Sequence, residues 1–151
     1  METTTRSAIV EDLPILLQFE QGIIEAERPF DPTLKKGNIN YYDIRELIES
    51  PDAEVVVVED QEILGSGYIQ IQDSKPYKKH SRHGYIGFMF IKPDHRGKGI
   101  VQLVTNDLLD WARSRGVSEV KLEVYDKNES AVRAYEKAGF SKNLVEMRLE
   151  L

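Results

Sequence analysis

The chain has 151 residues, no cysteine and a formal net charge of −6, with 40% hydrophobic and 30% charged residues. This composition is typical of a folded globular protein, and the length suits a single domain over residues 1–151. The lack of cysteine excludes a disulfide scaffold, a thiolate zinc site and a cysteine nucleophile. The longest uncharged run, residues 63–72, is too short to span a bilayer. Residues 1–5 also lack the basic and apolar regions of a signal peptide, so we expect a cytoplasmic protein that is not bound to a membrane.

The sign of the charge argues against nucleic acid as the main partner, because nucleic-acid binding uses clustered lysine and arginine. The charge is unevenly distributed. Residues 1–74 carry 16 acidic and 5 basic side chains, a net of −11, whereas residues 75–151 carry 10 acidic and 15 basic side chains, a net of +5. Two interpretations stay open: both halves are simply solvated, or the basic half binds an anionic ligand and the acidic half faces a cationic one.

The first third of the chain predicts a strand and two helices. Residues 6–10 form a short strand candidate, and Asp12 is placed to cap a first helix with an apolar face. The prolines in residues 28–32 end regular helix there. A second helix is predicted over residues 41–49, before Pro51.

The middle of the chain predicts strands. A β-branched run at residues 55–58 and a second apolar run at residues 63–71 flank a polar turn, which indicates an antiparallel hairpin. A polar, basic loop follows over residues 72–82. Residues 85–91 are apolar on both faces and therefore predict a central strand.

The last third alternates helices and strands. Residues 100–112 have the clearest helical stripe, and residues 120–124 predict a strand. A last helix is predicted between the N-cap residue Asn128 and the stop residue Gly139. Residues 140–151 then supply one or two terminal strands. The resulting order indicates an α/β protein with helices on the faces of a mixed sheet.

The most informative segment is residues 91–100, where a central strand ends and a glycine-rich turn enters a helix. Gly97 and Gly99 let the backbone approach a ligand, and the first amides of the helix have no partner within the helix. Arg96 and Lys98 add positive charge. The segment is therefore either an ordinary strand-to-helix turn or a cradle for a pyrophosphate.

A second motif follows about thirty residues later and has the spacing N-x-x-A-x-x-x-Y-x-x-x-G-F. It is met in full by Asn128, Ala131, Tyr135, Gly139 and Phe140. With the turn at residues 96–101, this pattern resembles the GNAT superfamily of acetyl-CoA-dependent N-acetyltransferases, whose turn motif is R/Q-x-x-G-x-G/A. The chain departs from that motif at its last position, where Val101 stands in place of glycine or alanine and introduces a bulkier side chain beside the phosphates.

The resemblance implies a GNAT fold, a mixed central sheet of about six or seven strands flanked by about four helices. It also implies transfer of the acetyl group of acetyl-CoA to a primary amine by direct attack in a ternary complex. The acidic charge of residues 1–74 leads us to expect a small cationic amine as the acceptor. Two alternatives stay open: acetylation of protein N-termini or lysines, and a non-catalytic acyl-CoA-binding regulatory module. The oligomeric state is undetermined, with a homodimer among the options.

The family's cofactor-binding positions can be transferred to matching residues. The resemblance implies that the backbone of the central strand pairs with the pantetheine arm, at Met89, Phe90 and Ile91. It implies that amides of the turn and first helical turn, with Arg96 beside them, hold the pyrophosphate, at Gly97, Lys98, Gly99, Ile100, Val101 and Gln102. Asn128 would contact acetyl-CoA through its side-chain amide, in addition to capping its helix.

The resemblance also suggests two catalytic residues. Tyr135 would donate a proton to the departing thiolate, although a tyrosine on the apolar face of a helix is commonly a core residue. Many relatives carry an acidic base at the position of Gly87, and this chain has no carboxylate between Asp73 and Asp94. Glu123 is the expected substitute, since a charged amine must lose a proton before it attacks. Glu123 could instead be a rim residue, and another carboxylate or a water chain could be the base.

The acceptor side is expected near the proline-broken loop. Three carboxylates there are candidates for recognising the amine, and plain acidic surface is the alternative: Glu25, Glu27 and Asp31. No metal is expected, because the histidines lie in or beside polar loops and His80 and His83 have no third ligand in register.

Overall fold

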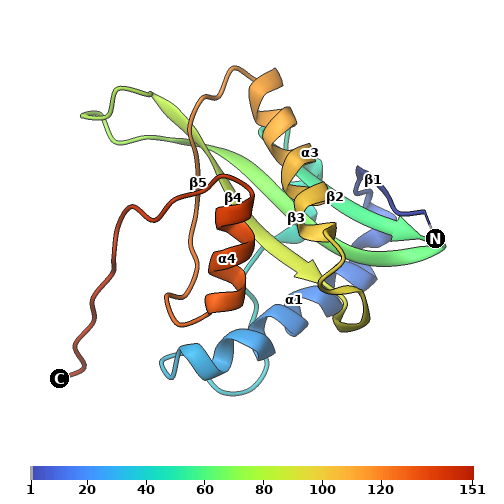
Figure 1. Cartoon of the computed structure of the whole chain (residues 1–151), viewed down its shortest axis with the longest axis horizontal. Helices are drawn as coiled ribbons and strands as arrows, with labels where there is room; N and C mark the ends of the chain where they lie inside the picture. The colour runs from blue at the N-terminus through green and yellow to red at the C-terminus, as the bar shows by residue number, and fades with distance from the viewer. Residues whose placement is uncertain (1) are drawn as a thin grey trace.

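The computed structural model describes residues 2–151, which form one sheet with helices on both faces (Figure 1). The strands are β1 (Thr4–Ser7), β2 (Ala53–Asp60), β3 (Glu62–Asp73), β4 (Arg82–Ile91) and β5 (Val120–Leu122). The α-helices are α1 (Leu13–Glu27), α2 (Ile44–Glu49), α3 (Ile100–Ser114) and α4 (Glu129–Lys137). Short 3₁₀ helices cover Val10–Asp12, Arg28–Phe30 and Pro93–His95.

The sheet has the order β1-β2-β3-β4-β5 and is mixed. The first four strands are antiparallel neighbours, whereas β5 pairs in parallel with β4 because α3 carries the chain across the sheet between them. The predicted hairpin is confirmed as β2 and β3, which turn at Gln61 with φ 65°. The predicted mixed α/β architecture is confirmed, with five strands in place of the expected six or seven.

Two apolar clusters lie on opposite faces of the sheet, and β2 shows how one strand serves both. Val55 and Val57 pack with residues of α1 and α2, while Val56 and Val58 pack with residues of α3. All four side chains are buried, because alternate residues of a strand point to opposite faces. The central strands are therefore fixed between two layers of helices, as a base for the loops at their ends.

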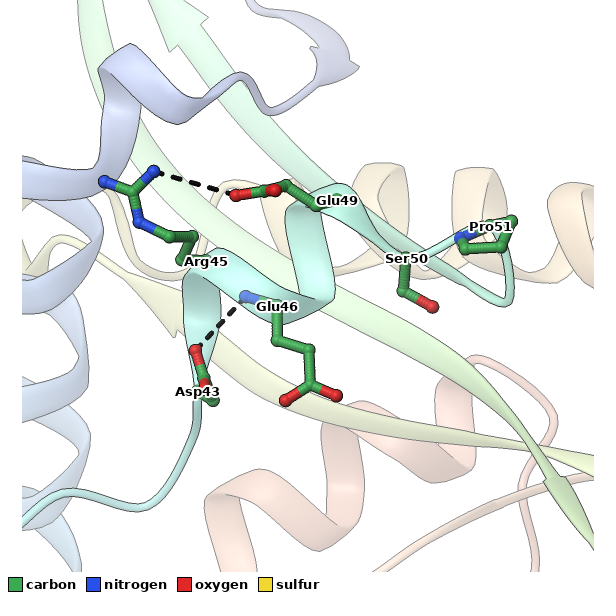
Figure 2. A pocket seen from close by; sticks show the side chains of 6 residues that line it. All are labelled: Asp43, Arg45, Glu46, Glu49, Ser50 and Pro51. Carbon is green, nitrogen blue, oxygen red and sulfur yellow. Dashed lines mark hydrogen bonds and ion pairs between the residues drawn. The ribbon is translucent and has the colours of Figure 1, made fainter.

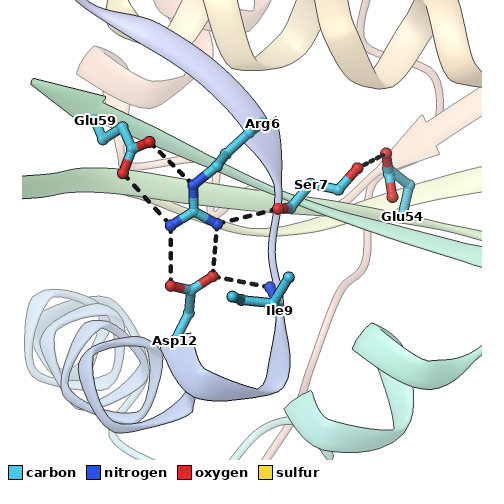
Figure 3. A network of polar contacts seen from close by, with 6 residues as sticks. All are labelled: Arg6, Ser7, Ile9, Asp12, Glu54 and Glu59. Atoms are coloured by element: carbon cyan, nitrogen blue, oxygen red, sulfur yellow. Dashed lines mark hydrogen bonds and ion pairs between the residues drawn. The ribbon is translucent and has the colours of Figure 1, made fainter.

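Asp12 does not cap α1, contrary to the prediction. Its carboxylate accepts two hydrogen bonds from the Arg6 guanidinium, at 2.8 and 3.0 Å, and one from the Ile9 N–H at 2.8 Å (Figure 3). Arg6 also bonds Glu59 of β2 at 3.0 Å. The two carboxylate oxygens are thus occupied by Arg6 and the Ile9 N–H, so Asp12 joins β1 to the start of the helix instead of capping it.

The predicted terminal strands are also absent. Residues 141–151 follow α4 without strand or helix, and Figure 1 shows this segment leading away from the rest of the molecule. A strand needs a neighbour for its backbone groups, and no backbone hydrogen bond joins these residues to another residue of the range 2–151. None of the helices described is long and apolar enough to cross a membrane.

Candidate active site

The site begins where β4 and β5 separate. Their parallel pairing ends at Ile86 and Leu122, after three residue pairs. A bulge then shifts the register of β4 against β3, and Phe88 takes the left-handed conformation with φ 58°. The backbone of Met89–Ile91 therefore has no strand partner on the β5 side, which leaves an edge open to an extended ligand.

Two side chains hold the bulged residue. The Phe88 N–H donates to the Tyr42 hydroxyl at 3.3 Å, and the Ser66 hydroxyl donates to the Phe88 carbonyl at 3.1 Å. The aromatic side chain of Phe88 is itself buried in the core. Both backbone groups of Phe88 therefore have hydrogen-bond partners, which stabilise the bulge at the point where β4 separates from β5.

The turn into α3 offers a row of free amides. Gly97 and Gly99 have φ 77° and 79°, and no atom lies within 4 Å of a Cβ added at either position. The N–H groups of residues 97–101 have no partner among the described residues, whereas the Gln102 N–H bonds the Gly99 carbonyl at 3.2 Å. Free amides at the positive end of a helix dipole are suited to an anionic ligand.

The charged and bulky residues of this turn have different positions. The Arg96 Nε donates to the Ile91 carbonyl at 3.0 Å and its guanidinium lies 5.8 Å from the Phe90 ring, so Arg96 braces the turn against β4. Lys98 is exposed and makes no ion pair with a described residue. The departure from the family motif is accommodated, because the Val101 side chain packs on the core cluster beneath α3.

Helix α4 places the second motif beside this turn. The Asn128 Oδ1 accepts the Ala131 N–H at 3.3 Å, which confirms the predicted cap and leaves the side-chain NH₂ without a partner. The Gln102 Nε2 donates to the Ala134 carbonyl at 3.0 Å and ties α4 to the first turn of α3. Tyr135 packs edge to face with Phe140, with ring centroids 6.1 Å apart.

The Tyr135 hydroxyl belongs to a group of tyrosines gathered around Glu27. Burial, and after it the negative charge of Glu27, raise the pKa of Tyr135 to about 12. The group has three further members, Tyr41, Tyr42 and Tyr125. Burial raises the pKa of each of these hydroxyls, and the negative charge of Glu27 raises it further. Burial raises the pKa of the Glu27 carboxyl itself, and the nearby Tyr41 hydroxyl opposes this shift. A partly buried carboxylate whose charge acts on neighbouring tyrosine hydroxyls offers a negative charge to an ammonium group.

A second carboxylate fixes two of these tyrosines. Glu20, wholly buried on α1, accepts the N–H groups of Tyr41 and Tyr42 at 2.7 and 2.8 Å through its Oε2. The loop before α2 is thereby fastened to α1. Sequence reasoning found Tyr135 but missed Glu20, Tyr41 and Tyr42. Two adjacent tyrosines in a polar segment, Tyr41 and Tyr42, were the sequence feature that could have indicated a functional role for this loop.

The three carboxylates predicted to recognise the amine have different surroundings in the structure. Glu27 faces the tyrosines, whereas Glu25 is exposed and pairs with Arg28 at 2.9 Å. Asp31 lies at the edge of the group, where its carboxylate accepts the Tyr125 hydroxyl at 2.7 Å and Arg148 at 3.0 Å. Hydrogen bonds from Thr33 first, and then from Tyr125, hold the pKa of Asp31 well below its usual range.

Glu123 lies just beyond β5, in the gap between the strands. Its Oε1 accepts the Tyr85 hydroxyl of β4 at 2.9 Å, and the rest of the side chain is exposed to solvent. Its charge adds to the effect of burial in raising the pKa of Tyr68. Glu123 makes no ion pair with a described residue, and the α4 residue Arg133 lies 3.9 Å from Glu129.

Two surface hollows lie on the acidic half. One runs along α2 and is lined by Asp43, Arg45, Glu46, Glu49, Ser50 and Pro51 (Figure 2). It shares no residue with the turn or the tyrosine group. The other, of about 600 Å³, is lined by residues 33–35 and 38–41, including Tyr41, and therefore adjoins the tyrosine group. Within residues 2–151, no three histidine or acidic side chains are grouped closely enough to hold a metal ion.

The comparisons with known proteins agree with this geometry. The profile of the acetyltransferase (GNAT) family matches residues 19–140, so the chain belongs to this family. Among its relatives, N-alpha-acetyltransferase 30 of Schizosaccharomyces pombe is 39% identical over 59 residues, which are 39% of this chain and 39% of the relative. Glucosamine 6-phosphate N-acetyltransferase of Trypanosoma brucei brucei is 32% identical over 90 residues, 59% of this chain and 58% of the relative.

Solved structures show the same fold. A predicted acetyltransferase from Clostridium acetobutylicum, crystallised with acetyl-CoA, has a TM-score of 0.75, with 21% identity over 99% of this chain and 96% of that one. The residues present fit acetyl-CoA, because the open turn supplies free amides for its phosphates and the edge of β4 is free for its pantetheine arm. When bound, acetyl-CoA supplies an activated thioester.

Proposed function

We propose that residues 1–151 form a single cytoplasmic acetyltransferase domain that moves the acetyl group of acetyl-CoA to a primary amine. The observation that carries this proposal is that the open turn before α3 and the helix bearing Tyr135 lie side by side. The amides of residues 97–101 are open at the start of α3, and Gln102 ties that turn to the helix that bears Tyr135. The turn suits an anionic cofactor, and a tyrosine beside it suits proton donation.

Each side chain then has a role that follows from its surroundings. The turn amides and the edge of β4 position the thioester. Tyr135, a phenol that is protonated at neutral pH, would donate a proton to the departing thiolate. Glu123 accepts the proton of the amine through its exposed carboxylate. Asn128 offers its side-chain NH₂ to acetyl-CoA while its oxygen caps α4. No metal takes part in this scheme.

The acceptor we propose is a small cationic amine. Glu27 supports this choice, because it is a half-buried carboxylate without an ion pair among the described residues, and it lies beside the hollow at residues 33–41. The net charge of −11 over residues 1–74 favours the same sign of ligand. A basic protein N-terminus or lysine has the same charge and is the second candidate, and the relative from fission yeast bears the name of an N-alpha-acetyltransferase.

The experiment is a thiol-release screen with acetyl-CoA against polyamines, amino sugars, aminoglycosides, amino acids and basic peptides. The enzyme has no cysteine, so every free thiol in the assay comes from coenzyme A. We expect thiol release that depends on a cationic amine and falls with added salt, which screens the attraction. Release with neutral or acidic amines alone would contradict the proposed acceptor class.

A binding measurement separates the enzyme from a non-catalytic acyl-CoA-binding module. Acetyl-CoA at 100 times its Kd should stabilise the fold by about 2.7 kcal/mol in thermal melts with chelator present. Stabilisation without thiol release for any amine would favour the module. The absence of any shift at millimolar acetyl-CoA would overturn both readings.

A further inference from the structure

The bulge of β4 reverses the faces of the residues that follow it. Between the pairs Gly87–Tyr68 and Phe90–Ser66, β4 uses one residue more than β3. Two consecutive residues, Gly87 and Phe88, therefore both lie on the face of the sheet that α1 and α2 cover. Because alternation resumes only after them, every later residue of β4 lies on the face opposite to the one that strict alternation from the start of the strand would give it.

The bulge also turns the backbone. The Gly84 N–H donates to the Glu119 carbonyl, just before β5, at 2.9 Å, whereas the Lys92 N–H donates to the Leu64 carbonyl of β3 at 2.8 Å. In a regular strand, residues an even number apart direct their backbone groups toward the same neighbouring strand. Residues 84 and 92 do not, because the extra residue lies between them. After the bulge, it is the backbone groups of the odd-numbered residues that point into the gap between β4 and β5.

The side chain of Tyr42 contacts the bulge directly. Phe88 has φ 58°, which is a costly conformation for a bulky residue. Its N–H donates to the Tyr42 hydroxyl at 3.3 Å. The Tyr42 ring also packs against the rings of Phe88 and Tyr68, with centroids 5.4 and 5.6 Å away. Tyr42 therefore both bonds the bulged residue and contacts its neighbour on β3.

Tyr42 is itself fixed by α1. The wholly buried Glu20 accepts the N–H groups of Tyr41 and Tyr42 through one carboxylate oxygen, at 2.7 and 2.8 Å. Hydrogen bonds to an ionised group are stronger than those between neutral groups. The backbone of Tyr42 is thus attached to a helix of the core, and its hydroxyl is held in place above β4.

We propose that Tyr42 is a positioning residue of the acetyltransfer site, which acts through the bulge at Phe88 to direct the backbone of Met89 and Ile91 at the pantetheine arm of acetyl-CoA. The inference rests on the proposed function, since it requires acetyl-CoA at this edge of β4. Tyr42 sets the fraction of molecules whose edge is ready to bind. The apparent Kd of a ligand rises when only part of the population is competent to bind it.

The first test is Tyr42→Phe, which removes the hydroxyl and keeps the ring. We expect the Kd for acetyl-CoA, measured by titration calorimetry, to rise at least about tenfold, the equivalent of 1.4 kcal/mol. A loss of this size is within the cost of leaving a buried N–H without a partner. An equal Kd for wild type and variant would overturn the inference alone. A wild type that does not bind acetyl-CoA would overturn the proposed function, and this inference with it.

Hydrogen exchange of the free protein gives a readout that needs no acetyl-CoA. A hydrogen-bonded amide exchanges only when its bond opens, so exchange reports the local stability of the bulge. In Tyr42→Phe, the Phe88 amide should exchange at least about tenfold faster, while the amides of β2 keep their wild-type rates. Exchange of the Phe88 amide at the wild-type rate would overturn the role of Tyr42, whatever acetyl-CoA does.

The matched control is Val57→Ala. Val57 is fully buried in the same apolar cluster as Tyr42 and belongs to β2, which does not pair with β4. The cavity that this substitution leaves should lower the melting temperature. We expect its Kd for acetyl-CoA, measured well below the melting temperature, to equal that of the wild type. If Val57→Ala raised the Kd as much as Tyr42→Phe does, general loss of stability would explain both, and the proposal would fail.

A second variant removes the other partner of the bulge. Ser66→Ala deletes the hydroxyl that donates to the Phe88 carbonyl at 3.1 Å, and we expect it also to raise the Kd for acetyl-CoA. In the double variant Tyr42→Phe/Ser66→Ala, the two effects on the Kd should not multiply, because both side chains hold the same residue. Fully independent effects would mean that the two hydroxyls do not act through one bulge, and would contradict the proposal.

Discussion

Gly87 of β4 lies against Tyr68 of β3, and a Cβ added at Gly87 would stand 2.6 Å from the ring carbon Cε1. The ring of Tyr68 thus occupies the space of a side chain at residue 87. This relationship explains why the acidic base that the family resemblance associates with this strand position is missing. Glycine here is required by the packed tyrosine, and a carboxylate has to come from another element.

The first prediction concerns that contact. Gly87→Ala should reduce the free energy of unfolding by about 1–3 kcal/mol, because an extra methyl group in a packed core forces its neighbours to shift. Urea denaturation measures the loss. The double variant Gly87→Ala/Tyr68→Leu should lose less unfolding free energy than the two single variants lose together, because the smaller side chain at residue 68 makes room for the added methyl group. Full additivity would show that the two residues do not compete for the space.

The second prediction concerns Tyr135. Tyr135→Phe removes one hydroxyl from a half-buried ring, so acetyl-CoA binding should persist while kcat falls by about 10²–10⁴-fold, the usual range for general acid catalysis. Single-turnover thiol release and the thermal shift with acetyl-CoA measure the two effects separately. Tyr77→Phe, at an exposed position, is the matched control and should leave both unchanged. An unaltered rate of the chemical step would remove Tyr135 from the mechanism.

Local patterns predicted most of the fold, because they record which face of each element is buried. Asp12 shows where they fail, since its chemistry suits a cap but its carboxylate binds Arg6, a contact that exists only in the folded protein. Residues 145–151 alternate apolar and charged side chains as a strand does, yet residues 141–151 make no backbone hydrogen bond to another described residue. The motif residues of the site could be found by spacing. The gathering of Glu27 with Tyr125 and Tyr135 could not, because about a hundred residues separate them in sequence.

The third prediction tests Glu123 as the base. A lysine-like amine has a pKa of about 10.4 and is almost wholly charged at neutral pH. Glu123→Gln should therefore lower kcat/KM most near pH 7, and the deficit should shrink as the amine loses its proton without help toward pH 10. The pH profile of thiol release for wild type and variant gives the comparison. A deficit that is constant across this range would mean that Glu123 acts only through its bond to Tyr85.

The last prediction separates Glu27 from its neighbour Glu25. Burial raises the pKa of Glu27 in the folded protein, so the folded state binds this proton more tightly than the unfolded chain does. That contribution to stability is present at low pH and is lost as the pH rises through the raised pKa. At neutral pH the ionised carboxylate therefore destabilises the fold.

Glu27→Gln should accordingly keep or raise the melting temperature at pH 7, while it raises KM for a cationic acceptor by at least about fivefold, the equivalent of roughly 1 kcal/mol for a partly screened ion pair. Glu25→Gln changes an exposed carboxylate paired with Arg28 and should leave both quantities nearly unchanged. Steady-state kinetics and melting curves for the two variants make the comparison. If Glu27 had only a structural role, Glu27→Gln would lower the melting temperature and leave KM unchanged. That result would mean that the acceptor binds elsewhere.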